Sequence, residues 1–248
     1  MQLKFEEVDK HFGQLEVIKG FNGEFAQGEL VALVGPSGCG KSTLLHLVAG
    51  LENPTAGRVL ADGKKIPGPS PRRTLVFQEH ALYPWLSLLG NVAMALELQG
   101  VAKTSAFEQA AAWLTKVGLD GFEHYYPHQV SGGMRQRTAL ARAFIAEPEV
   151  LLLDEPFGAL DALTRMALQD VLLELIKEHQ PTVLLVTHDV DEALYLADHV
   201  LVFSARPARV LKTFNFTHCE KSHDLTMFAA ERTEILRLLG IKTEVTSG

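Results

Sequence analysis

Short apolar runs alternate along the chain with longer segments of helical periodicity. Where every residue of a run is apolar, as in 150–153, the pattern is typical of a parallel strand buried on both faces. In 163–176, apolar residues recur mostly at spacings of three to five, which predicts a helix that Pro181 prevents from continuing. The strand-like runs are 30–34, 74–77, 150–153, 182–186 and 200–203. This alternation predicts an α/β fold with a mostly parallel, doubly wound sheet.

One long segment departs from that alternation. Helical patterns fill 88–99, 105–117 and 131–146, and no strand pattern lies between them. We therefore predict a single domain over 1–248 whose α/β core receives a helical subdomain at approximately 86–146. A short tail, approximately 210–248, is weakly patterned, and 231–239 predicts a short amphipathic helix.

Composition narrows the class of protein. The chain has 248 residues, of which 47% are hydrophobic and 21% charged, as in ordinary globular domains. Its net charge of −7 gives no overall attraction to nucleic acid. Cys39 and Cys219 lie far apart in sequence, so we expect no disulfide framework and a reducing compartment. The apolar runs are far shorter than the ~20 residues of a membrane span, and the first residues have no apolar core of an export signal.

The strongest chemical signal is Gly35–Ser42, which fits the phosphate-loop pattern G-x-x-x-x-G-K-[ST]. An apolar strand precedes it, and a helical segment at 41–49, which Gly50 is expected to end, follows it. Glycines let the main chain curl so that successive N–H groups face one anion, and the start of the helix adds its positive dipole end. Lys41 would contact the β- and γ-phosphates, and the Ser42 hydroxyl would bind Mg²⁺.

Two adjacent acids follow the buried run 150–153. Asp154 and Glu155 come at the carboxyl end of a strand, where ligands of open α/β sheets bind. We expect Asp154 to hold the Mg²⁺ shell and Glu155 to orient or deprotonate the attacking water. The Asn/Thr-Lys-x-Asp element of guanine-binding proteins does not occur in the sequence, which disfavours a GTPase.

A third element is Ser131-Gly132-Gly133, which opens the last helix of the predicted insert. Here the sequence resembles the ATP-binding cassette (ABC) family, and the resemblance runs over almost the whole chain. It includes six elements in family order: the phosphate loop, Gln78, Ser131-Gly132-Gly133, Asp154-Glu155, Gly158–Asp161 and Thr187-His188-Asp189.

The resemblance implies an ATPase of the P-loop NTPase fold, with a small antiparallel β part and with ATP and Mg²⁺ as its ligands. Phe12 would stack on adenine, with a place in the core as the alternative. Gln78 and Glu155 would act on the attacking water, Gln78 would also touch Mg²⁺ together with Ser42 and Asp154, and His188 would contact the γ-phosphate. The implied ATP-binding residues are Phe12, Gly35, Ser37, Gly38, Cys39, Gly40, Lys41, Ser42 and Thr43.

The family also implies a head-to-tail pair of cassettes, made of two copies or of one copy and a paralogous ABC subunit. In such a pair Ser131, Gly132 and Gly133 face the nucleotide held by the partner, and Asp161 reaches across the dimer. The family usually has Gln after Ser-Gly-Gly, whereas this sequence has Met134, so the role of that position is open.

Three segments resemble the importer ATPases of the bacterial nitrate, sulfonate and taurine group: 82–85, 154–162 and 204–210. This resemblance implies two membrane permease subunits as partners, a solute-binding protein as an indirect partner, and a place on the cytoplasmic face of the inner membrane. A coupling helix of a permease would dock at 79–86; packing of Leu82, Tyr83 and Trp85 between insert and core is the alternative.

Two other functions have less support. A non-transport ABC ATPase acting on nucleic acid or ribosomes would usually have two fused cassettes or long basic insertions, and the sequence has neither. A cassette that senses ATP without turnover is disfavoured because Gln78, Glu155 and His188 are all present. His218, Cys219 and His223 are irregularly spaced for a metal site, and a polar loop is the preferred interpretation.

Overall fold

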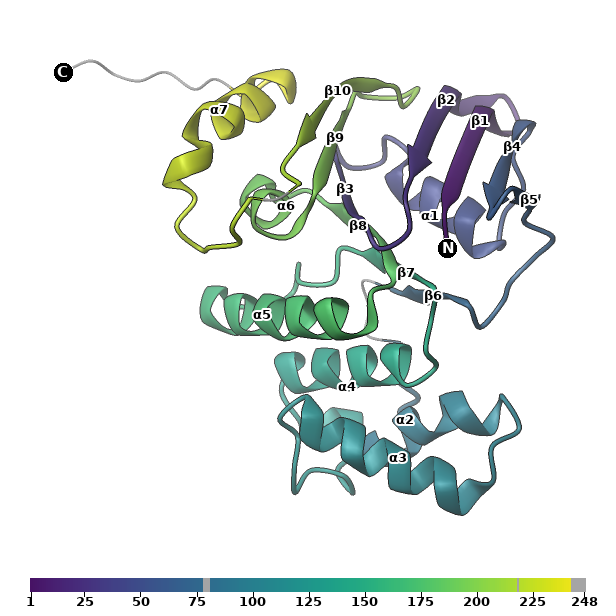
Figure 1. Cartoon of the computed structure of the whole chain (residues 1–248), viewed down its shortest axis with the longest axis vertical. Coiled ribbons are helices and arrows are strands. Elements are labelled where there is room, and N and C mark those ends of the chain that lie inside the picture. Colours follow the sequence, from purple (N-terminus) through teal and green to yellow (C-terminus); the bar gives the residue numbers. More distant parts are fainter. Residues whose placement is uncertain (78–80, 218, 242–248) are drawn as a thin grey trace. The chain divides into compact units, whose positions relative to one another are not determined.

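The computed structural model describes residues 1–77, 81–217 and 219–241 (Figure 1). The chain divides into two compact units. The first unit combines Met1–Ser70 with Thr182–Gly248, and the second unit is Pro71–Pro181.

The first unit contains parallel strands that position the phosphate loop. Strands β3 (Leu30–Val34), β8 (Thr182–Thr187) and β9 (His199–Phe203) are parallel, with β3 in the middle, and β10 (Val210–Asn215) adds to β9 in the antiparallel direction. Every residue of β3 and β8 is buried, which explains their unbroken apolar sequence. The helices of this unit are α1 (Lys41–Ala49), α6 (Val190–Leu196) and α7 (Ala229–Leu238), and η2 (Thr226–Phe228) is a 3₁₀ turn.

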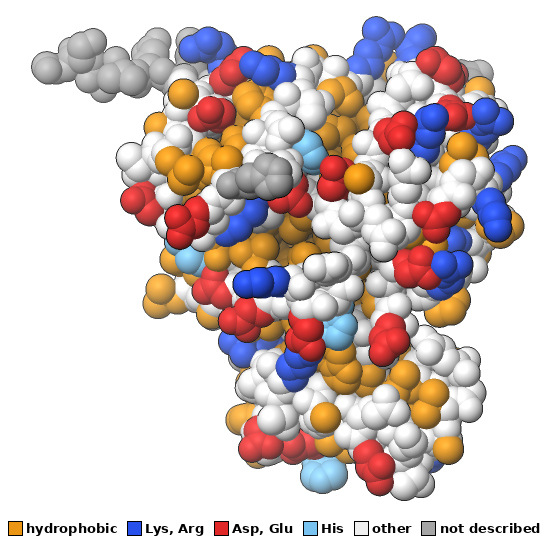
Figure 2. All heavy atoms as spheres, viewed as in Figure 1, with side chains coloured by type: hydrophobic (Ala, Val, Ile, Leu, Met, Phe, Trp, Pro, Cys, Tyr) orange, Lys and Arg blue, Asp and Glu red, His pale blue; other side chains and the backbone are white. Residues whose placement is uncertain are grey.

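The same unit contains an antiparallel sheet in the order β2-β1-β4-β5. Its members are β1 (Leu3–Phe12), β2 (Leu15–Phe25), β4 (Ala56–Ala61) and β5 (Lys64–Lys65). The inner face packs aromatic rings edge to face, with the Phe5 centroid 5.0 Å from that of Phe21. The outer face carries acidic and basic side chains, among them Lys4 and Arg58, which form ion pairs with Glu6. Acidic and basic side chains also lie among one another over the surface shown in Figure 2.

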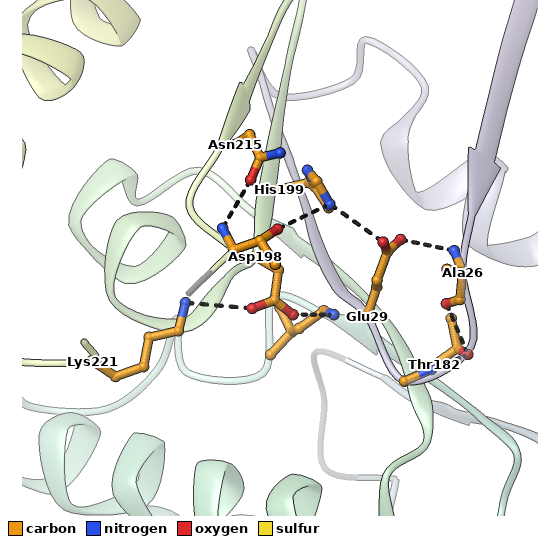
Figure 3. Close-up of polar contacts among 10 residues, drawn as sticks. Ala26, Glu29, Thr182, Asp198, His199, Asn215 and Lys221 are labelled. Atoms are coloured by element: carbon orange, nitrogen blue, oxygen red, sulfur yellow. Dashed lines mark hydrogen bonds and ion pairs between the residues drawn. The ribbon is translucent and has the colours of Figure 1, made fainter. Parts of the chain in front are cut away.

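Polar side chains fix the amino-terminal ends of the parallel strands (Figure 3). The Asp198 carboxylate accepts the N–H of Leu30 at 2.9 Å, and Glu29 lies 3.4 Å from the His199 ring. Buried Thr182 donates its hydroxyl to the Met1 carbonyl at 2.6 Å and accepts the Gly28 N–H at 3.1 Å. These bonds satisfy main-chain groups at the end of the strands opposite the phosphate loop.

The second unit joins two strands to a group of helices. Strands β6 (Arg73–Val76) and β7 (Val150–Asp154) are parallel, with Val76 opposite Leu153. The helices are α2 (Leu88–Glu97), α3 (Lys103–Lys116), α4 (Gly132–Phe144) and α5 (Ala162–His179), and η1 (Pro127–Gln129) is a 3₁₀ turn before α4. Packing between α2, α3 and α4, and of α5 beside α4, buries one apolar face of each helix (Figure 1).

The predicted α/β fold class, its strands and its helices are confirmed. Between 81 and 149 the described residues form helices and turns without a strand, as the pattern indicated. No helix of the described chain is both long and apolar enough to cross a bilayer.

Thr182→Val tests the polar anchor of β8. The substitution keeps the shape of the side chain but leaves the buried carbonyl of Met1 and the N–H of Gly28 without this partner. We expect the free energy of unfolding, measured by urea denaturation, to fall by about 1–3 kcal/mol. The control Thr213→Val changes an exposed threonine on β10 and should change the free energy of unfolding by less than ~0.5 kcal/mol. Equal values for the two variants would contradict the anchor.

Candidate nucleotide-binding and catalytic site

The start of α1 is open to an anion. Helix α1 begins at Lys41 with no capping side chain and no acid in its first turn. Side chains cap α2, α4, α5 and α6, whereas α3 and α7, like α1, begin without a side-chain cap. Of these uncapped starts, that of α1 follows the glycine-rich loop. The first N–H groups of a helix need a partner, and the uncapped start of α1 suits a phosphate.

Two glycines of the loop, Gly35 and Gly40, leave too little room for a side chain. A Cβ on Gly35 would be 3.0 Å from the Phe203 Cβ. Gly40 has φ 124°, and its Cβ would be 2.9 Å from Val17 Cγ1. The loop therefore rests directly on β2 and on the end of β9, while Ser37 and Gly38 at its tip are exposed. This close approach fixes the curl of the main chain that a phosphate requires.

Lys41 places its ammonium group inside the curl of the loop. The Nζ atom donates to the carbonyls of Gly35 at 2.7 Å and Pro36 at 3.0 Å. Cys39 is buried beneath the loop, with its Sγ 3.8 Å from Lys41 Nζ. Cys39 can therefore contribute to an anion site only through its main chain. Ser42 and Thr43 are half-buried in the first turn of α1.

His188 and the phosphate loop share one edge of the sheet. Val34 pairs with Thr187, and the next residues are Gly35 on one strand and His188 on the other. His188 is exposed in the tight turn between β8 and α6. The Asp189 carboxylate holds this turn by accepting the N–H groups of Asp191 at 2.9 Å and Glu192 at 3.2 Å.

Phe12 is not a core residue. Its side chain is 45% exposed at the end of β1, and Lys10 Nζ lies 4.6 Å from the ring centroid. The cation over the ring stabilises its position. The exposed ring can stack on a base, so the alternative of a buried Phe12 is wrong, and its contact with adenine stays a prediction.

The second unit holds the two acids. Asp154 ends β7, and Glu155 follows with φ 47°, a left-handed conformation that costs a residue with a side chain about 1–3 kcal/mol. Such strain concentrates at functional sites. Phe157 is fully buried and anchors the turn after the acids. Gln78, the predicted third member of the catalytic set, lies outside the described residues.

Ser131 caps α4 with its hydroxyl oxygen, which accepts the Met134 N–H at 3.3 Å. The cap uses the main chain of Met134, so it does not depend on the side chain at that position. A Cβ on Gly133 would lie 2.5 Å from Thr164 Cγ2 of α5, which requires glycine there. Gly132 is less restricted, because the nearest atom to its Cβ would be 3.4 Å away.

Asp161 caps α5 and meets the same threonine. Its carboxylate accepts the Thr164 N–H at 3.0 Å, and the hydrogen bonds from Thr164 lower the pKa of Asp161. Thr164 thus touches both the Ser-Gly-Gly turn and the Asp161 turn. Thr164 was not predicted as a site residue; its one signal in the sequence is its place three residues after a capping acid, where such a carboxylate finds its N–H donor.

Comparison with known proteins identifies the family of this site. The ABC transporter family pattern matches residues 18–158, which include the phosphate loop, Ser131-Gly132-Gly133 and Asp154-Glu155. The chain belongs to the ABC transporter family. The cassette is 44% identical to an uncharacterized ABC transporter ATP-binding protein of Methanocaldococcus jannaschii, over 96% of the chain and 91% of that protein. It is 43% identical to an aliphatic sulfonates import ATP-binding protein of Bacillus thuringiensis, over 96% of the chain and 95% of that protein.

Solved structures agree with this assignment. The cassette resembles a dimeric bacterial ABC transporter cassette with a TM-score of 0.76 and 30% identity, over 86% of this chain and 98% of that one. A dimeric post-hydrolysis state of an ABC cassette bound to ADP and Pi matches with a TM-score of 0.75, the same identity and the same coverage. The predicted P-loop NTPase fold and the prediction of an ABC ATPase are confirmed.

Gly133→Ala tests the close approach of α4 to α5. The added methyl group would overlap Thr164 Cγ2, so we expect the free energy of unfolding to fall by about 1–3 kcal/mol, as for overpacked cores. Thr164→Ser removes Cγ2 but keeps the hydroxyl group beside Asp161. The double variant should therefore recover most of the loss in a double-mutant cycle measured by urea denaturation. Additive losses would contradict this packing.

Proposed function

We propose that this cassette binds and hydrolyses ATP to power a bacterial importer of a small solute, of the nitrate, sulfonate or taurine type. The observation that carries the proposal is the end-to-end similarity to an aliphatic sulfonates import ATP-binding protein, at 43% identity. Aliphatic sulfonates, which that protein's name gives as its transported solutes, are the first class to test.

The site residues divide the chemistry between them. In the first unit, the loop amides and Lys41 hold the β- and γ-phosphates, Ser42 offers its hydroxyl to Mg²⁺, and His188 contacts the γ-phosphate. In the second unit, Asp154 offers a carboxylate to Mg²⁺, and Glu155 takes the proton of the attacking water. Gln78 is the further proposed Mg²⁺ ligand. Mg²⁺, when bound, would neutralise charge on the phosphate oxygens. The curl of the loop around the Lys41 ammonium group, at the uncapped start of α1, supports the fit to a phosphate.

We propose that two cassettes close head to tail on two ATP molecules. The exposed Ser131 and the main chain of Gly133 in one cassette would then meet the γ-phosphate held by the other, and Asp161 would reach across the pair. The likeness to a dimeric cassette supports this arrangement. Binding of ATP favours the closed pair and hydrolysis releases it, so each cycle delivers a movement to whatever is attached.

An apolar groove in the second unit offers a place for that attachment. It has a volume of about 520 Å³. Its walls include Thr74, Val76, Phe77, Tyr83, Met94, Leu98 and Arg142. Leu98 is 77% exposed and Trp85, beside Tyr83, is 69% exposed. The alternative that Trp85 packs between the insert and the core is therefore wrong for this residue. An exposed apolar groove of this kind is typical of a binding surface.

Buried Asn91 fixes the loop that borders the groove. Its side-chain amide donates to the carbonyls of Tyr83 at 3.1 Å, Leu86 at 3.1 Å and Ser87 at 3.0 Å, and its oxygen accepts the Tyr83 N–H at 2.7 Å. An apolar groove with a hydrogen-bonded border suits an amphipathic helix of a partner. We propose that the coupling helix of a membrane permease subunit binds here.

This docking would place the cassette on the cytoplasmic face of the inner membrane, bound to two permease subunits. A solute-binding protein would then act on the complex indirectly, through the permease. Nucleic acid has no part in the proposal. On the face shown in Figure 2, basic side chains lie among acidic ones and form no basic stripe.

Trp85→Ala tests the groove. We expect association with the permease encoded in the same genome, measured by co-purification and titration in detergent, to weaken at least about tenfold, because an aromatic anchor typically contributes about 2 kcal/mol or more. ATPase activity of the isolated cassette should stay within about twofold. The control Leu211→Ala removes an exposed leucine on β10 and should leave both unchanged. Unaltered association of the Trp85 variant would contradict the docking site, and a wild-type cassette that binds no permease would contradict the importer.

A further inference from the structure

We propose that Arg206 is a positioning residue that clamps the tip of the phosphate loop from outside. The inference rests on the proposed use of this loop to bind ATP. Arg206 lies in the turn between β9 and β10, far from the loop in sequence. Its guanidinium donates to the Gly38 carbonyl through Nε at 3.1 Å and through Nη2 in a second, shorter contact. A forked, charged donor on one carbonyl is a strong and directional restraint.

The turn that carries Arg206 is itself fixed. The Ser204 N–H donates to the Arg209 carbonyl at 2.9 Å, and the Ser204 hydroxyl accepts the Arg209 N–H at 3.1 Å. The Ala208 N–H donates to the Val17 carbonyl at 2.9 Å. Val17 is the residue on which Gly40 of the phosphate loop rests. The turn that carries Arg206 and the base of the phosphate loop are therefore both held by Val17 of β2.

The tip of the phosphate loop lacks the packing contacts that hold the base of the loop. Gly35 and Gly40 are held by contact with β9 and β2, but Gly38 is exposed and has φ 72°, open to a residue without a side chain. The peptide between Gly38 and Cys39 is held at both ends. Arg206 donates to the carbonyl of this peptide group, which belongs to Gly38. The N–H of the same peptide group belongs to Cys39 and donates to the Pro36 carbonyl at 3.3 Å. These two hydrogen bonds fix the orientation of the peptide plane, and they therefore also fix the direction in which the chain continues into Gly40 and α1.

The clamp should persist while the other donor moves. Lys41 binds the carbonyls of Gly35 and Pro36 from inside the loop, and it must turn from them to reach a phosphate. Arg206 binds from the outer side and has no such competing role. A loop already shaped for its ligand binds more tightly, because less ordering remains to be done on binding. Arg206 thus acts on affinity for the phosphates rather than on the chemical step.

Arg206→Met and Arg209→Met make a matched pair. Each removes one positive charge from the same turn and keeps an unbranched side chain, and the main-chain bonds of Arg209 that close the turn are unaffected. We expect Arg206→Met to raise the Kd for ADP and the KM for ATP about five- to tenfold, as for loss of a charge-assisted hydrogen bond, with kcat within about twofold. Arg209→Met should stay within about twofold of wild type in all three. Arg206→Lys keeps a charged donor and should recover part of the affinity.

Equal ADP affinities for the two methionine variants would overturn the clamp. If Arg206→Met also unfolds more readily in urea, Arg206→Lys decides. A lysine variant with wild-type stability and an ADP affinity nearer to wild type supports the proposal, and one as weak as the methionine variant overturns it. Failure of the proposed function would look different, because the wild-type cassette would then bind no ATP or no permease.

Discussion

The main chain forms both candidate phosphate seats at points where no side chain fits. At the first seat, Gly40 lies against Val17, and at the second, Gly133 lies against Thr164. In each case the absence of a Cβ lets a helix begin where its N–H groups face outward, and a neighbouring element fixes the geometry. The seats differ in one respect: Ser131 caps its own helix, whereas α1 has no capping side chain. We propose that the first seat holds an anion by itself and that the second meets an anion held by another cassette.

In the second unit, two paired strands join the candidate acids to the candidate docking groove. Strand β6 lines the groove with Thr74, Leu75 and Val76, and it pairs with β7, which ends in Asp154. A shift at the acids that moved β7 would act directly on the strand beneath the groove. Paired strands are among the rigid, hydrogen-bonded elements through which sites in a protein can be coupled. Asn91 adds to this rigidity by tying the Tyr83 loop to α2.

Local sequence patterns predicted the elements with continuous or strictly periodic apolar residues. Helix α1 spans Lys41–Ala49 as expected, because Gly50 ends it in a left-handed conformation. The antiparallel strands β1, β2 and β4 were expected only as a small β part without positions, since charged residues such as Glu6 on their outer face interrupt the apolar runs. Strand β10 was missed because Phe214 is its one buried residue.

Motif spacing located the site residues, but their supports depend on contacts between distant parts of the sequence. Local sequence predicts neither the contact of Thr164 with Gly133 nor that of Arg206 with Gly38. The arginines of α4 show the same dependence: Arg135 and Arg137 donate to the carbonyls of Val130 and Val117, each at 2.7 Å. The sequence shows which side chains are present, but their hydrogen-bond partners depend on how the chain folds.

In the proposed pair, each ATP is enclosed between the phosphate loop of one cassette and the Ser-Gly-Gly turn of the other. Light scattering of the Glu155→Gln variant with saturating Mg-ATP tests it most directly, because this variant should keep both seats and lose the group that takes the proton from water. We expect the mass of two chains with ATP and of one chain with ADP, together with at least a hundredfold loss of turnover. A single-chain mass at saturating ATP, or unchanged hydrolysis, would contradict it.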